Sequence, residues 1–309
     1  MAFETGVATS LADLMSKLVT FATSELGWSN LGAAPASPAG TYLQSGSGGI
    51  FGIGGDDGTT TNALHLMACA SHTPGAAFGS QPETTFRNYS RARVGPNMVF
   101  PTAAYWFFGS GQYLHFVIED NPGEFWHGAL GTLDKNFSYS GGHYVCGTSD
   151  GGSPNAPATG ARNFPFTPFA GQGNGNPQSN GIIMAGTASF LNNNNDATRG
   201  YSQGSHPLAG NQSSHPCLNV YNDFVGRSLL TPLSVYCYRY ASTLRQYFIG
   251  KAPAMAGCGL KYLGGKGTMV LGSDTWYCFP IRKYWPTNND QAVGQISSGL
   301  WGLAYKRVD

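Results

Sequence analysis

The segment from residue 105 to residue 130 constrains the fold most strongly. Two runs of aromatic and β-branched residues, 105–108 and 113–119, are separated by the short segment Gly-Ser-Gly-Gln at 109–112. Such runs around a glycine-containing turn predict a β-hairpin. Asp-Asn-Pro-Gly at 120–123 is a second turn, and residues 124–130 return as a third strand. Three consecutive strands with short turns form an antiparallel meander.

The composition favours strands and turns over helices in the rest of the chain. Glycine supplies 44 of the 309 residues, about twice its usual share, and aromatic residues supply 13%. Aromatic residues fit pleated strands, and glycine is typical of turns. Charged residues make up only 11%, where soluble domains usually have about 25%. The composition excludes a coiled coil or a helical bundle, and 41% hydrophobic residues suffice for a folded core.

The charge balance argues against a nucleic-acid partner. Seventeen Lys and Arg against sixteen Asp and Glu leave a net charge of +1, whereas a protein that neutralises many phosphates needs a basic surplus. One basic patch exists, in which Arg87, Arg91 and Arg93 are interleaved with Phe86 and Tyr89. Such residues can stack on bases or sugars. We favour a surface strand, or an interface with acidic groups of a partner.

Cysteine usage and hydropathy point to synthesis in a reducing cytosol. No stretch approaches the roughly 18 apolar residues of a spanning helix, and residues 1–6 lack the regions of a signal peptide. We therefore expect no membrane partner. We also expect free thiols, because the cysteines are scattered without a CxxC pair or a dense disulfide framework. The six are Cys69, Cys146, Cys217, Cys237, Cys258 and Cys278.

One amphipathic helix is predicted near the N-terminus, over residues 11–24. Thr9 or Ser10 can cap it, and Asp13 lies three residues beyond Ser10, as in a capping box. Leu14, Leu18 and Phe21 recur at helical spacing and share one face. We expect this face to pack on the protein's own core. The alternative is docking on a neighbouring subunit, which makes these three residues interface candidates.

The remaining sequence divides into two β-rich portions. We predict an N-terminal helical segment at 1–30, a first β-rich portion at 31–140, a Gly/Pro-rich connection or long loop at 141–180, and a second β-rich portion at 181–309. Within the last, residues 233–240, 247–249, 268–271 and 275–281 are candidate strands. The fold class is mainly β, with antiparallel, sandwich-like portions and long Gly/Pro/Asn-rich loops. In the connection, Phe164, Phe166 and Phe169 are candidates for seating in a partner's groove.

The first β-rich portion contains a short apolar segment that is interrupted by glycines. The apolar island at 49–54 reads Gly-Ile-Phe-Gly-Ile-Gly. Glycine permits close backbone approach or unusual turns, so we expect one of these here.

Catalytic motifs are incomplete. Residues 147–151 match the GxSxG pattern around Ser149, but the Gly/Pro-rich sequence that follows cannot form the helix that this motif requires. The glycine-rich segment 264–268 resembles a phosphate loop but has Leu260 at the first glycine position and Gly267 at the magnesium-ligating position. We therefore expect no catalytic residue, no metal and no cofactor.

Two groups of titratable residues are candidates for a structural role or for chemistry. His115 and His127 lie on strands that we expect to be neighbours, and we favour hydrogen-bonded structural histidines over a metal site. Glu119, Asp120 and Glu124 cluster around one turn. Two of them could serve a glycosidase, but we favour a solvated turn.

Three blocks of sequence resemble structural proteins of tailed bacteriophages and prophages. The opening Phe3-Glu4-Thr5-Gly6 with the following helix and Trp28 resembles the start of such proteins. The aromatic hairpin at 105–113, leading into the 125–128 strand, looks like theirs, and Asp274-Thr275-Trp276-Tyr277-Cys278-Phe279-Pro280 looks like their C-terminal strand motif. The resemblance covers about a quarter of the chain. It implies a virion component of the tail, neck or baseplate and carries over no functional residues.

These observations lead to one expected function and two alternatives. We expect a non-enzymatic virion protein, assembled in the host bacterial cytoplasm, that repeats as a homo-oligomer and contacts other virion structural proteins. Its low charge and high aromatic content suit assembly interfaces. The first alternative is a β-sandwich module that binds a host surface glycan through exposed aromatic residues. The second alternative is a cell-wall hydrolase.

Overall fold

The structure, a computed structural model, is mainly β. It describes residues 2–35, 38–56, 61–85, 92–95, 97–148, 180–184, 201–204, 230–240, 244–260, 262–281, 283–284, 297–299 and 301–307. These residues form three β-sheets and a short α-helix near the N-terminus. All strand pairs among them are antiparallel except one short parallel pair. The predicted fold class is therefore confirmed.

The central sheet contains the predicted aromatic meander. Its strands follow the order β1 (Ala2–Gly6), β7 (Ala104–Gly109), β8 (Tyr113–Asn121), β9 (Glu124–Thr132), β11 (Gly141–Gly147) and β12 (Asn180–Met184). The short strand β18 (Lys283–Tyr284) pairs with β9 and, in parallel, with β19 (Ser297–Gly299). The hairpin β7–β8 and the returning strand β9 lie where the sequence predicts them.

The N-terminal sheet and the helix form a second layer. The sheet order is β2 (Ser29–Ala34), β3 (Gly40–Gln44), β4 (Ile50–Gly54), β5 (Leu64–Cys69) and β6 (Ala92–Val94). Helix α1 (Leu11–Thr20) continues into one π-helical turn, η1 (Phe21–Glu25), and a short 3-10 turn, η2 (Phe78–Ser80), follows β5. The predicted helix is confirmed with nearly the expected bounds.

The C-terminal sheet forms the third layer. Its order is β13 (Tyr201–Gly204), β14 (Leu230–Tyr240), β15 (Leu244–Gly259), β20 (Trp301–Arg307), β17 (Asp274–Pro280) and β16 (Gly267–Leu271), and β10 (Asp134–Lys135) pairs with β15. The four strands expected here are present. β15 is far longer than expected, and Pro280 ends β17, as its missing N–H group favours.

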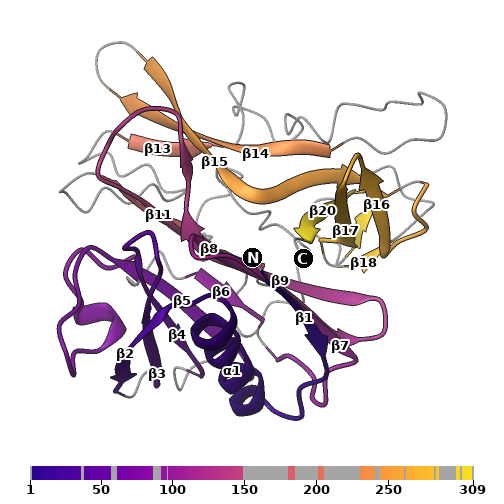
Figure 1. Cartoon of the computed structure of the whole chain (residues 1–309), viewed down its shortest axis with the longest axis horizontal. Coiled ribbons are helices and arrows are strands. Elements are labelled where there is room, and N and C mark those ends of the chain that lie inside the picture. Colours follow the sequence, from indigo (N-terminus) through magenta and orange to yellow (C-terminus); the bar gives the residue numbers. More distant parts are fainter. Residues whose placement is uncertain are drawn as a thin grey trace.

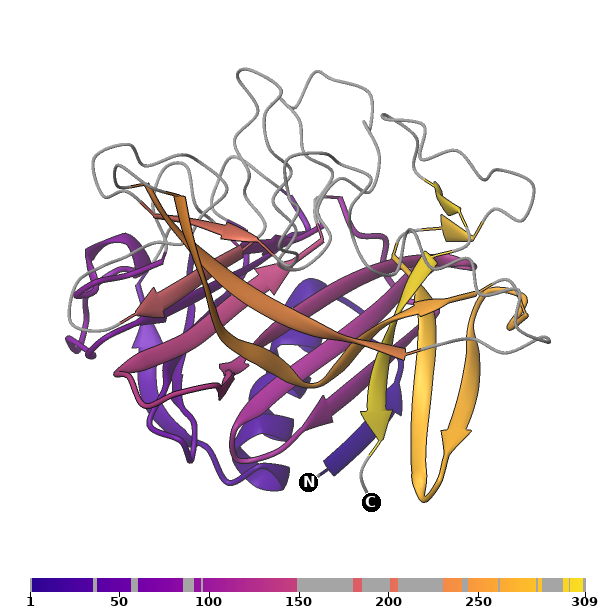
Figure 2. The ribbon, with the colours of Figure 1, turned by 90° about the horizontal axis from the view of Figure 1, so that it is seen from above.

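The central sheet lies between the other two layers. In Figure 1 the strands β7, β8, β9 and β11 run through the middle, with α1 and β2–β6 on one side and β13–β15 on the other. Figure 2 shows the long strands β14 and β15 crossing over the central strands, with the C-terminal hairpin at the outer side of the molecule. Each face of the central sheet thus contributes to a different core.

Side-chain alternation in β7 explains why both faces are apolar. Tyr105 and Phe107 pack in the core formed with α1 and the N-terminal sheet, whereas Trp106 and Phe108 pack in the core formed with the C-terminal sheet. Successive residues of a strand point to opposite faces. A strand covered on both faces therefore reads as a continuous run of large apolar residues, as this segment does.

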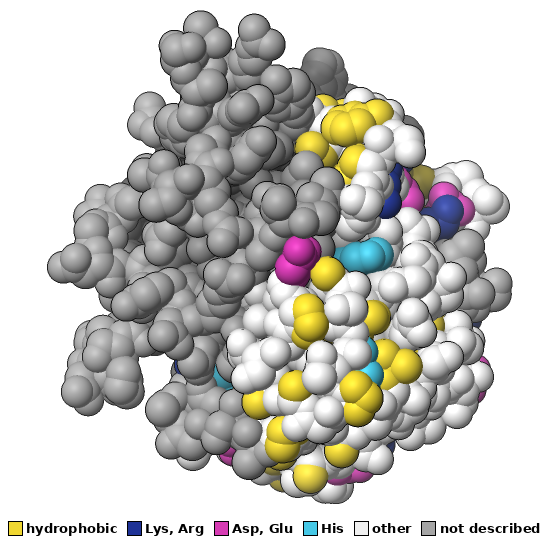
Figure 3. Space-filling view, turned by 90° about the vertical axis from the view of Figure 1, so that its left-hand side faces the viewer, with side chains coloured by type: hydrophobic (Ala, Val, Ile, Leu, Met, Phe, Trp, Pro, Cys, Tyr) yellow, Lys and Arg dark blue, Asp and Glu magenta, His cyan; other side chains and the backbone are white. Residues whose placement is uncertain are grey.

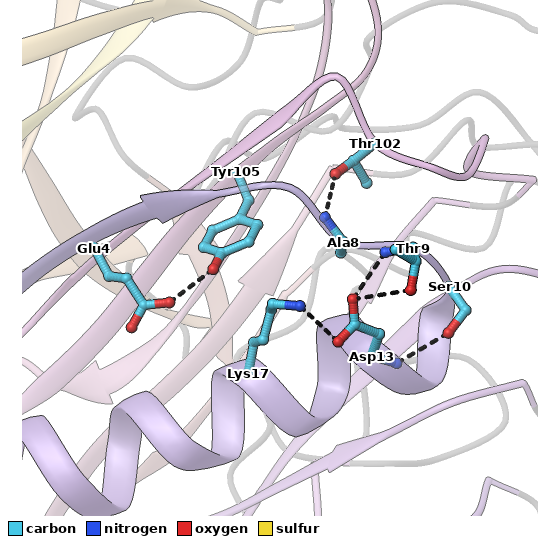
Figure 4. A network of polar contacts seen from close by, with 8 residues as sticks. All are labelled: Glu4, Ala8, Thr9, Ser10, Asp13, Lys17, Thr102 and Tyr105. Carbon is cyan, nitrogen blue, oxygen red and sulfur yellow. Dashed lines mark hydrogen bonds and ion pairs between the residues drawn. The ribbon is translucent and has the colours of Figure 1, made fainter.

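The helix begins with the predicted capping box (Figure 4). The Ser10 hydroxyl accepts a hydrogen bond from the Asp13 backbone N–H at 3.1 Å, and the Asp13 carboxylate accepts one from the Thr9 backbone N–H at 2.8 Å. These bonds satisfy amide groups that the first helical turn leaves without partners. Lys17 lies 2.6 Å from the same carboxylate, and this bond keeps the pKa of Asp13 below its usual value.

Strand β1 and the segment after it tie the helix to the central sheet. The Tyr105 hydroxyl donates to the Glu4 carboxylate at 2.7 Å, and the Ala8 N–H donates to the Thr102 hydroxyl at 2.9 Å (Figure 4). Burial, with the Glu4 carboxylate beside it, raises the pKa of Tyr105. The opening residues therefore belong to the central sheet and do not form a separate helical segment.

The glycine island at 49–54 makes the close approach that the sequence predicts. It forms β4, and a methyl group on Gly52 would lie 2.7 Å from both Met67 and the Phe78 ring. Those side chains occupy the space above the bare backbone. A larger residue at position 52 would force Met67 or Phe78 to move, so glycine suits the packing here.

Two boundaries differ from the sequence prediction. Residues 141–147, assigned to a connection, form the central strand β11, and residues 149–179 lie outside the described part. The portion at 31–140 is divided between two sheets. At residues 141–147, strand pairing, which depends on distant partners, overrides the local Gly and Pro content.

Candidate functional site

His115 and His127 lie on neighbouring strands, as predicted. His115 belongs to β8 and His127 to β9, and both side chains are buried between the central and C-terminal sheets. Each ring bonds to a tyrosine. Together with Tyr144 and Tyr305 they form a polar cluster in an otherwise apolar core.

The two ring nitrogens of His127 have partners that fix its tautomer. Nε2 lies 2.7 Å from the Pro280 backbone carbonyl, which can only accept, so Nε2 carries a proton. In the neutral ring, Nδ1 then accepts a hydrogen bond from the Tyr305 hydroxyl at 2.8 Å. The ring thereby connects β9 to two strands of the C-terminal sheet.

His115 is more completely desolvated. Its Nε2 lies 2.6 Å from the Tyr144 hydroxyl, its ring stacks on Tyr113, and its Nδ1 is buried without a hydrogen-bond partner. Burial lowers the pKa of His115 to about 3, because the charged ring would lose its hydration. The same effect raises the pKa of Tyr144 well above its usual value. Both groups are neutral at physiological pH, which suits a structural hydrogen bond.

The acidic turn is buried, so the solvated turn that we favoured from the sequence is wrong for Glu119 and Asp120. Glu119 accepts from the Gly123 N–H at 2.8 Å and pairs with Lys266 at 2.8 Å. Asp120 accepts from the indole N–H of Trp126 at 2.8 Å. Burying a carboxylate requires such partners. These two carboxylates are committed to internal contacts that hold the turn.

Lys266 comes from the glycine-rich segment that resembles a phosphate loop. Its ammonium group bonds to Glu119 and lies 4.9 Å from the centre of the Trp106 ring. A cation over an aromatic face is stabilised by the ring quadrupole. This lysine therefore fastens the turn before β16 to the central sheet.

Several sequence candidates cannot be placed. Ser149 and Cys217 lie outside the described residues, as do Phe86, Arg87, Tyr89 and Arg91 of the basic patch, and the Cys237 side chain is not described. The other four cysteines are buried free thiols: Cys69, Cys146, Cys258 and Cys278.

The predicted interface residues fall into two groups. Leu14, Leu18 and Phe21 are at most 1% exposed and pack against the chain's own sheets. The expectation that these residues pack on the protein's own core is therefore confirmed. Because they are buried, they are not available to a neighbouring subunit, and their assignment as interface candidates is wrong. This apolar face of the helix is covered by the sheets of the same chain. Phe164, Phe166 and Phe169 lie outside the described residues.

The exposed edge of β16 is a candidate interface that the sequence did not identify. Val270 and Leu271 are 67% and 47% exposed, and β16 pairs with β17 on one side only in the described part of the chain. The charged residues that flank this strand in the sequence are paired, since Lys266 binds Glu119 at 2.8 Å and Asp274 binds Lys306 at 2.7 Å. The sequence predicts this strand, but only the sheet order shows that it lies at an edge.

Another face of the molecule contrasts with this edge. In Figure 3 hydrophobic side chains lie scattered among uncharged atoms, and charged side chains are few on the described surface. Scattered apolar residues are normal on a protein surface. The exposed pair on β16 differs because it adjoins backbone groups that face no other strand of the described part of the chain.

Within the described residues, no three His, Cys, Asp or Glu side chains lie together so that they could hold a metal ion. None of the helices in the described segments has the length and apolar character needed to cross a membrane. Neither the protein-family models nor the curated proteins include a match to this chain.

Proposed function

We propose that the protein is a non-enzymatic structural subunit of a tailed-phage particle, in the tail, neck or baseplate. It assembles with copies of itself and with other virion proteins. The observation that carries the proposal is the edge of β16, which no described strand covers, with exposed Val270 and Leu271 and with the flanking charges of Lys266 and Asp274 paired elsewhere. An uncharged edge strand is a template for pairing with another chain.

The composition and the sequence resemblance support the same function. Assembly interfaces are rich in aromatic residues and poor in Lys and Glu, and this chain combines 13% aromatic with 11% charged residues. The blocks that resemble phage structural proteins correspond to β1, the β7–β8 hairpin with β9, and β17. These strands belong to two layers that share one core.

The two alternatives have less support. A glycan-binding module would use exposed aromatic residues; of the described tryptophans, Trp28, Trp106 and Trp126 are buried and Trp276 is partly buried, whereas Tyr262 is 45% exposed. A hydrolase would need available carboxylates, and Glu119 and Asp120 are held by internal contacts. Glycan arrays and zymograms with the purified protein test these alternatives directly.

The decisive test is the composition of the particle. Phage particles purified from lysates of the bacterium that carries the gene are analysed by mass spectrometry and electron microscopy. We expect the protein in many copies, with contacts near the standard ~800 Å² per partner. Absence from the particles, or a single copy with much smaller contacts, contradicts the proposal.

A further inference from the structure

The backbone of β16 presents a defined pattern of hydrogen-bonding groups at its open edge. A two-residue turn at 272–273 connects Leu271 to its partner Asp274. The pair that closes such a turn is hydrogen-bonded, and bonded and non-bonded pairs alternate along an antiparallel ladder. Gly267, Met269 and Leu271 thus bond inward to β17. The N–H and C=O groups of Thr268 and Val270 point to the open side.

The edge lacks the features by which proteins usually prevent edge pairing. These features are charged side chains, proline and β-bulges. Strand β2, at one end of the N-terminal sheet, has a register shift between Asn30 and Gly32. β16 contains no charge and no proline, and its pairing with β17 continues without a shift.

We propose that β16 pairs antiparallel with β16 of a second copy of this chain, about a twofold axis at Met269. This inference rests on the proposed function, since it names the contact through which copies associate. A register centred on Met269 places Thr268 opposite Val270 of the second copy and pairs all five residues. The outward-pointing backbone groups then meet each other. A register centred on any other residue of β16 leaves part of the strand unpaired.

The side chains fit this register. Leu271 lies opposite Gly267 of the second copy, so a large side chain meets a position without one. The two Met269 side chains lie next to each other on the same face, beside the partly buried Trp276 of the C-terminal sheet. β16 contains no charged residue, so the two paired strands bring no like charges face to face. Self-pairing of this kind is isologous and closes on itself.

The size of the contact determines how it must be detected. One pair of five-residue strands is much smaller than the roughly 800 Å² per partner of a standard interface. Pairing is therefore weak for isolated chains and is best trapped covalently. In this register the two Met269 residues form a non-hydrogen-bonded pair with Cα atoms about 4.5 Å apart, within the range that a disulfide can bridge.

The experiment is oxidative cross-linking of the purified full chain carrying Met269→Cys. Wild-type protein and Val99→Cys, a matched cysteine at an exposed loop position, are the controls. We expect a covalent dimer from Met269→Cys at a yield at least about tenfold above both controls. This corresponds to a tenfold difference in the association constant. Equal yields from Met269→Cys and Val99→Cys overturn the proposal.

A second variant tests the edge itself. Adding Val270→Lys to Met269→Cys should abolish the excess dimer, because a lysine then faces the second copy, whereas Val99→Lys should leave it unchanged. An excess that survives Val270→Lys also overturns the pairing. Many copies in phage particles without the Met269 cross-link would refute this contact and leave the proposed function intact. Absence from particles would refute the function whatever the cross-link shows.

Discussion

The tip of the Phe116 ring occupies the position that a Cβ on Gly128, its direct partner across the β8–β9 pair, would take. Both residues are buried on the face of the central sheet that packs on α1 and the N-terminal sheet. A methyl group on Gly128 would overlap the ring. The aromatic side chain fills the space that the glycine leaves, so these two residues act as one packing unit.

Gly128→Ala should therefore destabilise the protein by about 1–3 kcal/mol, the usual range for overpacking a core. Urea unfolding measures the change. Gly259→Ala is the control, because Gly259 also lies in a strand and its added methyl group would have no neighbour within 4 Å. The control should change the stability by less than about 0.5 kcal/mol. Equal effects would contradict the packing argument.

Ser10→Ala should reduce stability by about 1 kcal/mol through loss of the helix cap. The Ser10 hydroxyl is the acceptor for the Asp13 N–H, and alanine leaves that amide group to water. Thermal unfolding followed by circular dichroism measures the effect. Ser29→Ala, an exposed serine at the start of β2, should have little influence. A similar loss from both substitutions would show that the cap is unimportant.

Tyr305→Phe should reduce stability by about 1–3 kcal/mol, the typical effect of leaving a buried polar atom unpaired. The variant leaves Nδ1 of His127 without its donor in the core between the sheets. Tyr277→Phe is the control, since its hydroxyl is half-buried and has only a 3.5 Å contact with Arg307. Denaturant midpoints of the two variants should differ clearly, with Tyr305→Phe lower.

Stability should fall as the pH is lowered from about 6.5 toward 3. Burial holds the pKa of His115 at about 3 in the folded protein, while the unfolded chain binds the proton near pH 6.5. The unfolded state therefore takes up more protons in this window, and one such group lowers stability by up to ~1.4 kcal/mol per pH unit. His115→Gln should show a smaller loss between pH 6.5 and pH 4 than wild type. Parallel curves would contradict the assignment.

The four buried thiols should resist alkylation at pH 8 in the folded protein and react fully in urea. Burial raises the pKa of Cys69 to about 12, so little thiolate is available, and the reagent cannot reach any of the four. Peptide mass spectrometry assigns the label to Cys69, Cys146, Cys258 and Cys278 individually. Rapid labelling of any of them in native protein would show that its site opens.

The sequence predicts the parts of the fold that local patterns determine. The capping box gives the start of α1, and the aromatic runs around a glycine turn give β7 and β8. The segment Ser29–Ala34 has low strand propensity, yet it forms β2 because β3 lies beside it. Strand formation of this kind depends on partners and not on composition.

The contacts of the candidate sites depend on residues far apart in the chain. The sequence places His115 and His127 on neighbouring strands, but the partner of His127, Tyr305, is 178 positions away. The burial of Glu119 likewise depends on Lys266. The exposed edge of β16 follows from the strand order of the C-terminal sheet. No local pattern indicates these long-range relationships.

The position of β20 between β15 and β17 has a consequence for how the chain folds. Both neighbours precede β20 in the sequence, so the hairpin of β16 and β17 cannot join β15 until β20 has been synthesised and inserted. Until then, β15 and β17 each expose an unpaired edge during translation. Pairings between distant segments form slowly, and such transient edges favour misassembly. A chaperone that binds the nascent chain would therefore act on the edges of β15 and β17 before β20 has been synthesised.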